Sequence, residues 1–318
     1  MNQRSTNPFP FSDTNKRYHT FDYFARQTFG GKCVRVSLDA GFTCPNKDGT
    51  AGVRGCLFCA GGSSGAAAAG SVEEQYGAGI ERIRQKWTAD RFIPYLQANT
   101  NTYAPPDVLE ALYSRCAALP GAVMLAIGTR ADCLSPEVMD VLVRTSETIP
   151  LLVELGMQTV HEPTLSLIRR GYGHEEFLRG YRRLREAGGN IRIGLHILNG
   201  LPGESREQML QTAAEAAQLA PDMVKLHTLC VLRETDLAPM YEAGEYVPLT
   251  VEETVPLVCD QLELLPPQTV IARLSADAEK ERLLAPLWVR NKRGFENAVD
   301  TEMMHRGSMQ GLRFCGSY

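Results

Sequence analysis

Short apolar runs rich in β-branched residues alternate along the chain with longer segments in which apolar residues recur at helical spacing. This alternation begins near Lys32 and is typical of repeated βα units, whose strands form a parallel sheet. Six runs predict strands, near Cys33–Leu38, Phe92–Gln97, Val123–Ile127, Leu151–Leu155, Ile191–Leu198 and Met223–Leu229. We therefore expect an α/β fold whose functional loops follow the carboxyl ends of these strands.

Several of the intervening helices have recognisable start signals. In a capping box, a Ser or Thr side chain accepts the backbone N–H three residues later, and a Glu or Gln at that later position accepts the backbone N–H of the Ser or Thr. This pattern occurs at Ser71–Glu74, Ser205–Gln208 and Thr250–Glu253. Pro105–Pro106 and Ser135–Pro136 predict two more helix starts, because proline is favoured in the first turn.

Six βα units are too few to close the usual eight-stranded barrel. We therefore predict a curved, partly open (β/α)6 barrel over residues 31–249, with an open doubly wound sheet as the alternative. Residues 1–30 then form an N-terminal extension, and residues 250–318 form a small C-terminal α/β extension with a further strand at Thr269–Leu274. We expect the Gly-rich tail, Gly311–Tyr318, to be poorly ordered.

Composition and charge exclude several classes of protein. Hydrophobic residues make up 44% of the 318 residues and charged residues 22%, so neither a disordered nor a fibrous chain fits. The net charge of -4 gives no overall attraction to nucleic acid or anionic membranes. No apolar stretch approaches the ~20 residues of a membrane span, and the N-terminus is polar, so we predict a cytoplasmic protein without membrane association. The low-complexity stretch Gly61–Gly70 predicts a flexible loop.

The spacing of the cysteines carries the main chemical signal. Without a secretion signal, nine cysteines favour reduced thiols or metal thiolates over a disulfide framework. Cys44, Cys56 and Cys59 lie in one loop after the first predicted strand, separated by eleven and then two residues. Turn-forming residues fill the longer interval, so the chain is able to fold back and bring three sulfurs to one metal site.

Four interpretations of this loop are open from the residues alone. A structural zinc site needs four ligands, and Cys33, the available fourth, lies on a predicted strand. Cys56 and Cys59 alone would suit a dithiol redox pair, and inert buried thiols are a third interpretation. We favour an iron–sulfur cluster, because three cysteines leave one iron of a four-iron cluster open for chemistry.

The loop resembles the cluster loop of radical S-adenosylmethionine (SAM) enzymes, including the aromatic Phe58 before the last cysteine. The usual first interval in that family is three residues, whereas eleven are present here. Further segments are similar, in the same order, to the catalytic subunit of Elongator, a radical-SAM tRNA-modifying enzyme: Cys59–Gly62, Thr129–Asp132, Val153–Thr159, Arg170–Tyr172, His196–Gly203 and Val224–His227. The short chain and the stretch Gln97–Pro105 look more like bacterial YhcC-type radical-SAM proteins.

The resemblance implies a radical-SAM partial barrel that holds a 4Fe-4S cluster on Cys44, Cys56 and Cys59 and binds SAM. It also implies an electron donor such as flavodoxin or ferredoxin, and a 5′-deoxyadenosyl radical that takes hydrogen from a substrate the family does not identify. Besides Phe58, the cofactor-binding residues that it implies are Thr100, Asn101 and Thr102 at the methionine amino group, Glu154 and Gln158 at the ribose, and Gly200 and Gly203 near adenine.

Structural alternatives stand beside these roles. Thr100–Thr102 also suits a turn before a helix, and Gly200–Gly203 an ordinary βα turn. A buried Glu154 would otherwise need pairing, with Arg130 or Arg169 as the partner. His196, Lys225 and His227 are candidate substrate contacts or core residues, and no catalytic side chain is predicted.

Three functions follow in order of preference. The first is a radical-SAM enzyme of unassigned substrate. The second is a tRNA-modifying radical-SAM enzyme, for which Arg179, Arg182 and Arg183 on one helix face are candidate RNA contacts. The third is a non-enzymatic zinc or iron–sulfur binding protein. Cys116, Cys230 and Cys259 are expected to be core thiols, while Cys133 and Cys315 have no predicted role.

Overall fold

A computed structural model describes residues 7–60, 69–97 and 99–316 of the chain. These residues divide into two compact units. The cysteine-loop unit comprises Ala25–Met157 and Leu165–Gly194. The C-terminal unit comprises the N-terminal segment up to Phe24, the short segment Gln158–Thr164, and the chain from Leu195 onward. All but the last two residues of the predicted flexible loop at 61–70 lie outside the described residues.

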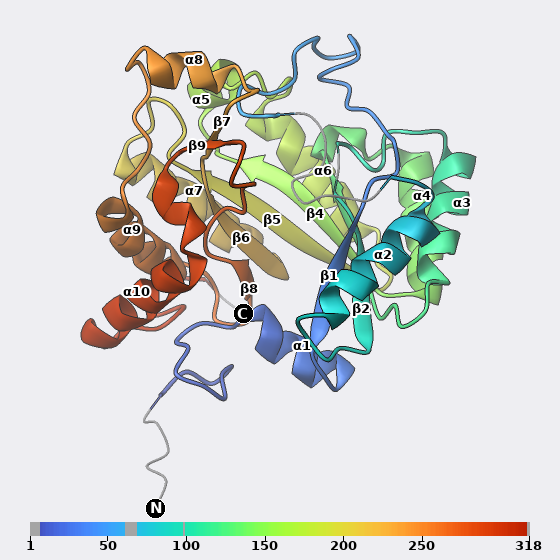
Figure 1. Ribbon diagram of the computed structural model, residues 1–318, viewed down its shortest axis with the longest axis horizontal. Coiled ribbons are helices and arrows are strands. Elements are labelled where there is room, and N and C mark those ends of the chain that lie inside the picture. The colour runs from blue at the N-terminus through green and yellow to red at the C-terminus, as the bar shows by residue number, and fades with distance from the viewer. Residues whose placement is uncertain (1–6, 61–68, 98, 317–318) are drawn as a thin grey trace, which may run out of the picture. The chain divides into compact units, whose positions relative to one another are not determined.

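The strands form a seven-stranded sheet in the order β1-β2-β3-β4-β5-β6-β8 (Figure 1). The first six confirm the six predicted strands: β1 (Cys33–Leu38), β2 (Arg91–Leu96), β3 (Leu125–Thr129), β4 (Leu151–Gln158), β5 (Ile191–Asn199) and β6 (Met223–Thr228). They follow one another in chain order, without the reversal that defines a doubly wound sheet. The partial barrel is therefore confirmed, and the doubly wound alternative was wrong.

The seventh strand comes from the region predicted as a C-terminal extension. β8 (Val270–Arg273) pairs in parallel with β6, with Met223 opposite Val270. The strand itself was predicted, but its pairing adds one strand beyond the six predicted for the barrel. A separate antiparallel pair joins β7 (Val231–Leu232) to β9 (Leu283–Ala285).

The C-terminal tail is held as far as the structure describes it, contrary to our expectation of poor order. Gly311 N donates to Leu262 O at 3.1 Å, and Arg313 N donates to Glu263 O at 2.8 Å. These bonds satisfy carbonyls in the last turn of α9 (Val251–Leu264), which the helix cannot satisfy itself. Residues 317 and 318 lie outside the described part of the chain.

The helices begin where the capping signals placed them. The three capping boxes are formed at Ser71, Ser205 and Thr250, and Pro106 and Pro136 occupy first-turn positions. The helices are α1 (Phe21–Phe29), α2 (Val72–Arg84), α3 (Pro106–Ala117), α4 (Pro136–Thr148), α5 (Glu162–Leu167), α6 (His174–Glu186), α7 (Arg206–Leu219), α8 (Leu237–Glu242), α9, α10 (Lys292–His305) and the 3₁₀ turns η1 (Ala131–Cys133) and η2 (Leu287–Arg290).

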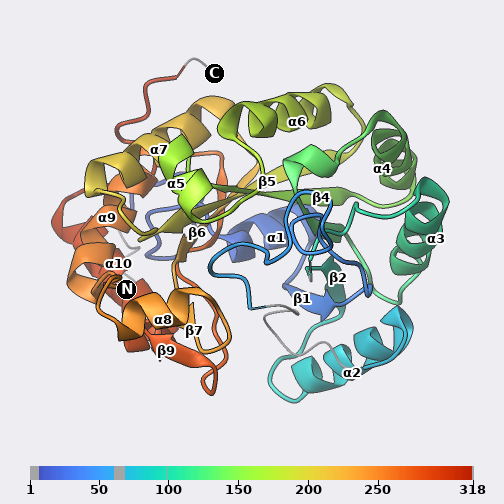
Figure 2. The ribbon, with the colours of Figure 1, turned by 90° about the horizontal axis from the view of Figure 1, so that it is seen from above.

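Within the cysteine-loop unit, α2, α3, α4 and α6 lie outside strands β1 to β4 (Figure 2). Central strands are apolar on both faces, as parallel strands covered by helices require: Leu125, Ala126 and Ile127 of β3 are fully buried. In parallel register, β1 to β4 end at one edge of the sheet, so the loops that follow them gather there. No helix in the described ranges is both long and apolar enough to cross a bilayer.

Candidate metal centre

The loop that follows β1, residues 39–60, is called the cysteine loop. It contains Cys44 and Cys56, which are half-buried, and Cys59, which is exposed. Cys59 N donates to Cys56 O at 2.9 Å, so these two cysteines already lie on one tight turn. The half-buried Phe58 lies between them.

The long interval between Cys44 and Cys56 is closed on itself by backbone hydrogen bonds. Gly55 N donates to Asn46 O at 2.7 Å, and Ala51 N donates to Pro45 O at 2.7 Å. The stretch from Lys47 to Arg54 is therefore an excursion that leaves and re-enters the loop at one point. Without it, only Pro45, Asn46 and Gly55 separate the two cysteines, which equals the usual three-residue interval of radical-SAM cluster loops.

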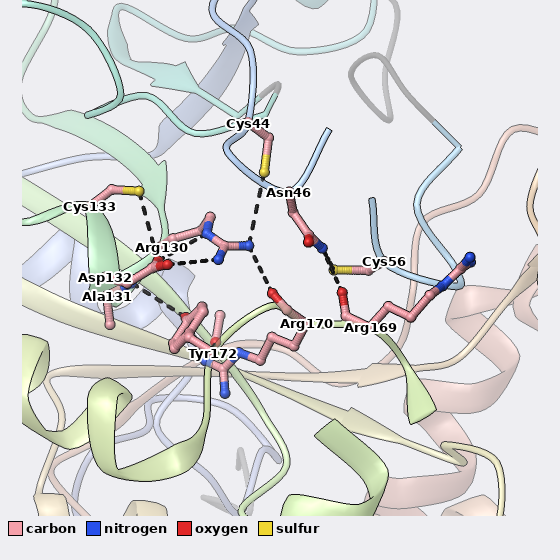
Figure 3. Close-up of polar contacts among 11 residues, drawn as sticks. Cys44, Asn46, Cys56, Arg130, Ala131, Asp132, Cys133, Arg169, Arg170 and Tyr172 are labelled. Carbon is pink, nitrogen blue, oxygen red and sulfur yellow. Dashed lines mark hydrogen bonds and ion pairs between the residues drawn. The ribbon is translucent and has the colours of Figure 1, made fainter. Parts of the chain in front are cut away.

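The segment after α5 braces the cysteine loop from within the same unit (Figure 3). Leu57 N donates to Ile168 O at 3.0 Å, and Asn46 Nδ2 donates to Arg169 O at 2.5 Å. Arg169 has φ 55°, a left-handed conformation that costs a non-glycine residue about 1–2 kcal/mol. Asn99, with φ 57°, holds the start of the loop by donating from Nδ2 to Phe42 O at 2.8 Å. The loop is thus fixed by backbone carbonyls at several points.

Two side-chain N–H groups point at cysteine sulfurs (Figure 3). Asn46 Nδ2 lies 3.5 Å from Cys56 Sγ, and Arg130 Nη1 lies 4.0 Å from Cys44 Sγ. Burial raises the pKa of Cys56 to about 11, together with the nearby Cys59, while Arg130 and Asn46 act in the opposite direction. The free thiol is therefore protonated at neutral pH, and a bound metal cation would be needed to hold it as thiolate.

The donor set fits an iron–sulfur cluster in its chemistry. Three cysteines lie in one loop, and donors to sulfur of this kind stabilise cluster thiolates. In the described ranges, no three His, Cys, Asp or Glu side chains are grouped as a formed metal site. Cys33 lies at the amino end of β1, about 17 Å of strand from its carboxyl end, and does not suit a fourth zinc ligand.

Thr100, Asn101 and Thr102 are all buried and tie the end of β2 to its neighbours. Thr100 N donates to Thr43 O at 3.2 Å, and Asn101 Nδ2 donates to Gly128 O at 3.0 Å. Thr102 Oγ1 donates to Cys133 O at 2.7 Å. These contacts support the cysteine loop, and a role at the methionine amino group stays a prediction.

Glu154 is buried in β4, and the structure identifies its partner as Arg35 of β1, with Nη1–Oε1 at 2.9 Å. Arg130, one of the two alternative partners considered, pairs with Asp132 instead. Gly128 lies opposite Glu154 in the β3–β4 register, and a Cβ on Gly194 would lie 3.1 Å from Glu154 Cγ. The small Gly194 on β5 therefore leaves room for the Glu154 side chain.

The remaining predicted cofactor residues lie in the C-terminal unit. Gln158 ends β4 with φ 62°. Gly200 and Gly203 both have φ 81°, so the tight turn expected there is confirmed. Tyr246 Oη donates to Gly200 O at 2.7 Å, and the backbone at Gly203 is open, since a Cβ at that position would meet no heavy atom within 4 Å. Gly203 thus leaves its backbone uncovered by side chains, whereas the Leu249 and Tyr246 side chains lie over Gly200.

The remaining candidate residues differ in their burial and in their contacts. His196 and His227 have ring centroids 5.1 Å apart, and Lys225 is buried. On α6, Arg179 pairs with Glu176 and Arg183 donates to Leu134 O, while Arg182 is exposed. Cys116 and Cys259 are fully buried, as expected of core thiols, whereas Cys230 is only half-buried.

Sequence reasoning did not identify Asn46 or Arg35 as members of these sites. Asn46 belongs to the turn-forming residues between Cys44 and Cys56, and an Asn two residues after a cysteine in a metal loop is a signal for a side chain that bonds sulfur or backbone. Arg35 had a weaker signal: a charged residue inside an otherwise apolar strand requires a buried partner.

Comparison with known proteins agrees with this geometry. Residues 49–216 match the family described as the Radical SAM superfamily, and residues 221–305 match the Radical_SAM C-terminal domain. The chain is 42% identical over 311 residues to the uncharacterized protein YtqA of Bacillus subtilis, covering 97% of this chain and 96% of that protein. It is 33% identical over 267 residues to protein YhcC of Escherichia coli, covering 83% and 85%.

Among solved structures, the chain resembles Elp3 of the archaeon Methanocaldococcus infernus, determined with an N-terminal deletion. The TM-score is 0.67 at 19% identity, and the match covers 87% of this chain but only 64% of that one. At this level of identity the likeness concerns the fold. It identifies the seven-stranded parallel sheet as a half-barrel of the kind found in that structure.

Proposed function

The chain belongs to the radical SAM superfamily, and we propose that it is an enzyme whose 4Fe-4S cluster is held by Cys44, Cys56 and Cys59. The observation that carries the proposal is the closure of the Lys47–Arg54 excursion by the Gly55 N to Asn46 O bond, 2.7 Å long. It reconciles the eleven-residue interval with the three-residue interval of other cluster loops. The remaining difference is an inserted surface turn.

When bound, the cluster and SAM supply a 5′-deoxyadenosyl radical that abstracts a hydrogen atom from substrate. The chain's own residues position the cofactors. Asn46 and Arg130 direct N–H groups at two of the cysteine sulfurs, and the carbonyls of Ile168 and Arg169 hold the loop in place. An electron donor such as a flavodoxin or ferredoxin belongs to this proposal.

For SAM itself we propose two groups of contacts. In the cysteine-loop unit these are Phe58, the backbone of Thr100–Thr102 and Glu154; in the C-terminal unit they are Gln158, Gly200 and Gly203. The Arg35 ion pair makes Glu154 the weaker ribose candidate, because its carboxylate already has a charged partner. Calorimetry of SAM binding to Glu154→Gln and Gln158→Ala tests this order: we expect the larger loss of affinity for Gln158→Ala.

Anaerobic reconstitution tests the enzyme proposal. We expect about four irons and four sulfides per chain, and 5′-deoxyadenosine after incubation with SAM and dithionite. Cys44→Ala, Cys56→Ala and Cys59→Ala should lose iron and product, whereas Cys116→Ala, at a fully buried thiol, should retain both. Stoichiometric zinc without iron, or no product from a fully loaded wild type, would favour the non-enzymatic alternative.

A tRNA substrate is the second candidate, favoured by the segments shared with the Elongator subunit and by the exposed Arg182 on α6. Binding through phosphates should weaken steeply with salt. We expect Arg182→Gln to weaken tRNA binding at low salt without changing iron content. Salt-independent binding, or the same affinity in both proteins, would exclude this surface as the RNA contact.

A further inference from the structure

The guanidinium of Arg130, directly after β3, is held in a fixed direction. Its Nε and Nη2 donate to the Asp132 carboxylate at 2.9 and 2.7 Å, and Nη1 donates to Arg170 O at 2.9 Å. The Tyr172 ring lies 4.7 Å from Cζ, and the Arg130 side chain is 11% exposed. Held by these bonds, Arg130 presents Nη1 to Cys44 Sγ at 4.0 Å.

The positive and negative charges of this pair contact different cysteines. The cation faces Cys44, and its counter-ion Asp132 lies two residues further along the chain, where Cys133 Sγ contacts it at 3.7 Å. Burial works against the charge of Arg130, but Asp132 outweighs burial and raises the pKa of the guanidinium, which therefore stays charged. Cys56 has a different neighbour, the neutral amide of Asn46. The hydrogen bond from a charged donor is thus made to Cys44, while the charge of Arg130 also acts on Cys56 at longer range.

We infer that Arg130, oriented by Asp132, raises the reduction potential of the cluster through Cys44, an inference that rests on the proposed function. Reduction adds one negative charge to the cluster, and an N–H donor or cation at a ligating sulfur stabilises the reduced form more than the oxidised form. Asp132 acts twice: its bonds aim the cation, and its negative charge offsets part of the effect.

The step that this inference concerns is the one-electron reduction of the cluster. One electron passes from dithionite to the cluster, dithionite is oxidised, and no bond in the protein forms or breaks. Arg130 takes no proton and touches no substrate. Its contribution is electrostatic and should appear in the midpoint potential of the cluster even in the absence of SAM.

The experiment is a redox titration of the reconstituted protein, followed by electron paramagnetic resonance of the reduced cluster, without SAM. Arg130→Gln removes the cation and leaves the Asp132 carboxylate uncompensated, so the potential should fall. Asp132→Asn keeps the cation and removes the opposing charge, so the potential should rise. We expect each variant to change the ratio of reduced to oxidised protein at a fixed potential about tenfold, which is 59 mV for a one-electron couple.

Arg144 and Glu110 provide a matched control, because they form an exposed pair in the same unit with Nε–Oε1 at 3.0 Å. Arg144→Gln and Glu110→Gln should leave the potential unchanged. If Arg130→Gln fails to take up iron, Arg130→Lys, which keeps the charge but not the planar donors, and Asp132→Asn decide the question. A merely structural role would not produce shifts of opposite sign.

Shifts in the same direction for the two charge variants, or shifts no larger than those of the Arg144 and Glu110 controls, overturn the inference. If the wild type still forms 5′-deoxyadenosine in that case, the proposed function stands and only the role of Arg130 is rejected. A wild type that takes up no iron overturns both. The inference is supported by a rise for Asp132→Asn together with a fall for Arg130→Gln, or together with a smaller fall for Arg130→Lys where Arg130→Gln takes up no iron.

Discussion

Two arginine–carboxylate pairs in the cysteine-loop unit differ in how the chain makes them. Arg130 and Asp132 are two residues apart, and their side chains are 11% and 19% exposed. Arg35 and Glu154 are 119 residues apart, on strands β1 and β4, and Glu154 is 1% exposed. The first pair forms within a short turn and directs the Arg130 guanidinium toward Cys44 Sγ. The second pair links strands and is enclosed by the sheet.

This difference indicates which substitutions in the unit should affect stability and which should affect the metal site. Around the cysteine loop, backbone groups make most of the contacts, so side chains contribute tuning more than shape. Around Glu154, a buried carboxylate pairs with Arg35 and lies close to Gly194, where a side chain would crowd it. We therefore expect substitutions in the sheet to cost stability and substitutions in the loop to affect iron and potential.

Breaking the Arg35–Glu154 ion pair should have the largest effect on stability. Glu154→Ala leaves Arg35 without its carboxylate, and removing one partner of a buried pair costs about 3–5 kcal/mol. Urea unfolding of the metal-free protein measures this. Glu110→Ala, which breaks the exposed pair with Arg144, should cost much less, because solvent screens that pair. Equal costs for the two variants would show that the Arg35 pair is no more important than a surface ion pair.

The glycines beside Glu154 give a smaller and sharper test. In Gly194→Ala the new Cβ would lie 3.1 Å from Glu154 Cγ and 3.4 Å from Leu152 Cδ1, and overpacking of this kind costs about 1–3 kcal/mol. The matched control is Gly77→Ala in α2, where nothing lies within 4 Å of the Cβ position. Alanine should stabilise that helix by about 0.5–1 kcal/mol. Melting temperatures that move in the same direction would contradict the proposed close fit.

Excision of the excursion should have the smallest effect. Deleting residues 47–54 joins Asn46 to Gly55, whose O and N atoms are already 2.7 Å apart, so iron uptake should remain at the wild-type level. Lost with it are exposed contacts such as Thr50 Oγ1 to Tyr103 Oη at 2.9 Å, and one wall of a cavity of about 590 Å³ that Cys133 also lines. Iron analysis after reconstitution gives the result.

A deletion one residue longer is the control for that excision. Removing Asn46 as well leaves two residues between Cys44 and Cys56 and takes away the donor to Cys56 Sγ. This variant should lose iron. If the two deletions behave alike, the closure at Asn46 and Gly55 does not explain the long interval.

Local signals in the sequence predicted much of this fold, because caps and strands depend on neighbouring residues. The three capping boxes and the six strands are examples. The pairing of Glu154 with Arg35 was not predicted, because it depends on which side chain of a distant strand faces Glu154, and no local pattern encodes that. The closure of the excursion was missed for another reason: backbone N–H and C=O groups make it, and they are the same in every residue.

The interleaved order of the two units has a consequence for synthesis on the ribosome. In the C-terminal unit, Ile271 N donates to His19 O at 2.7 Å, and His19 N donates to Gln310 Oε1 at 2.8 Å. The segment around His19 is therefore made well before its partner at Ile271, because synthesis of the intervening chain takes roughly 10–50 s at about 5–20 residues per second. During this time Tyr18, which is buried in the folded protein, lacks the contacts made by the later segment. We therefore expect this segment to stay exposed to chaperones on a ribosome stalled before Ile271.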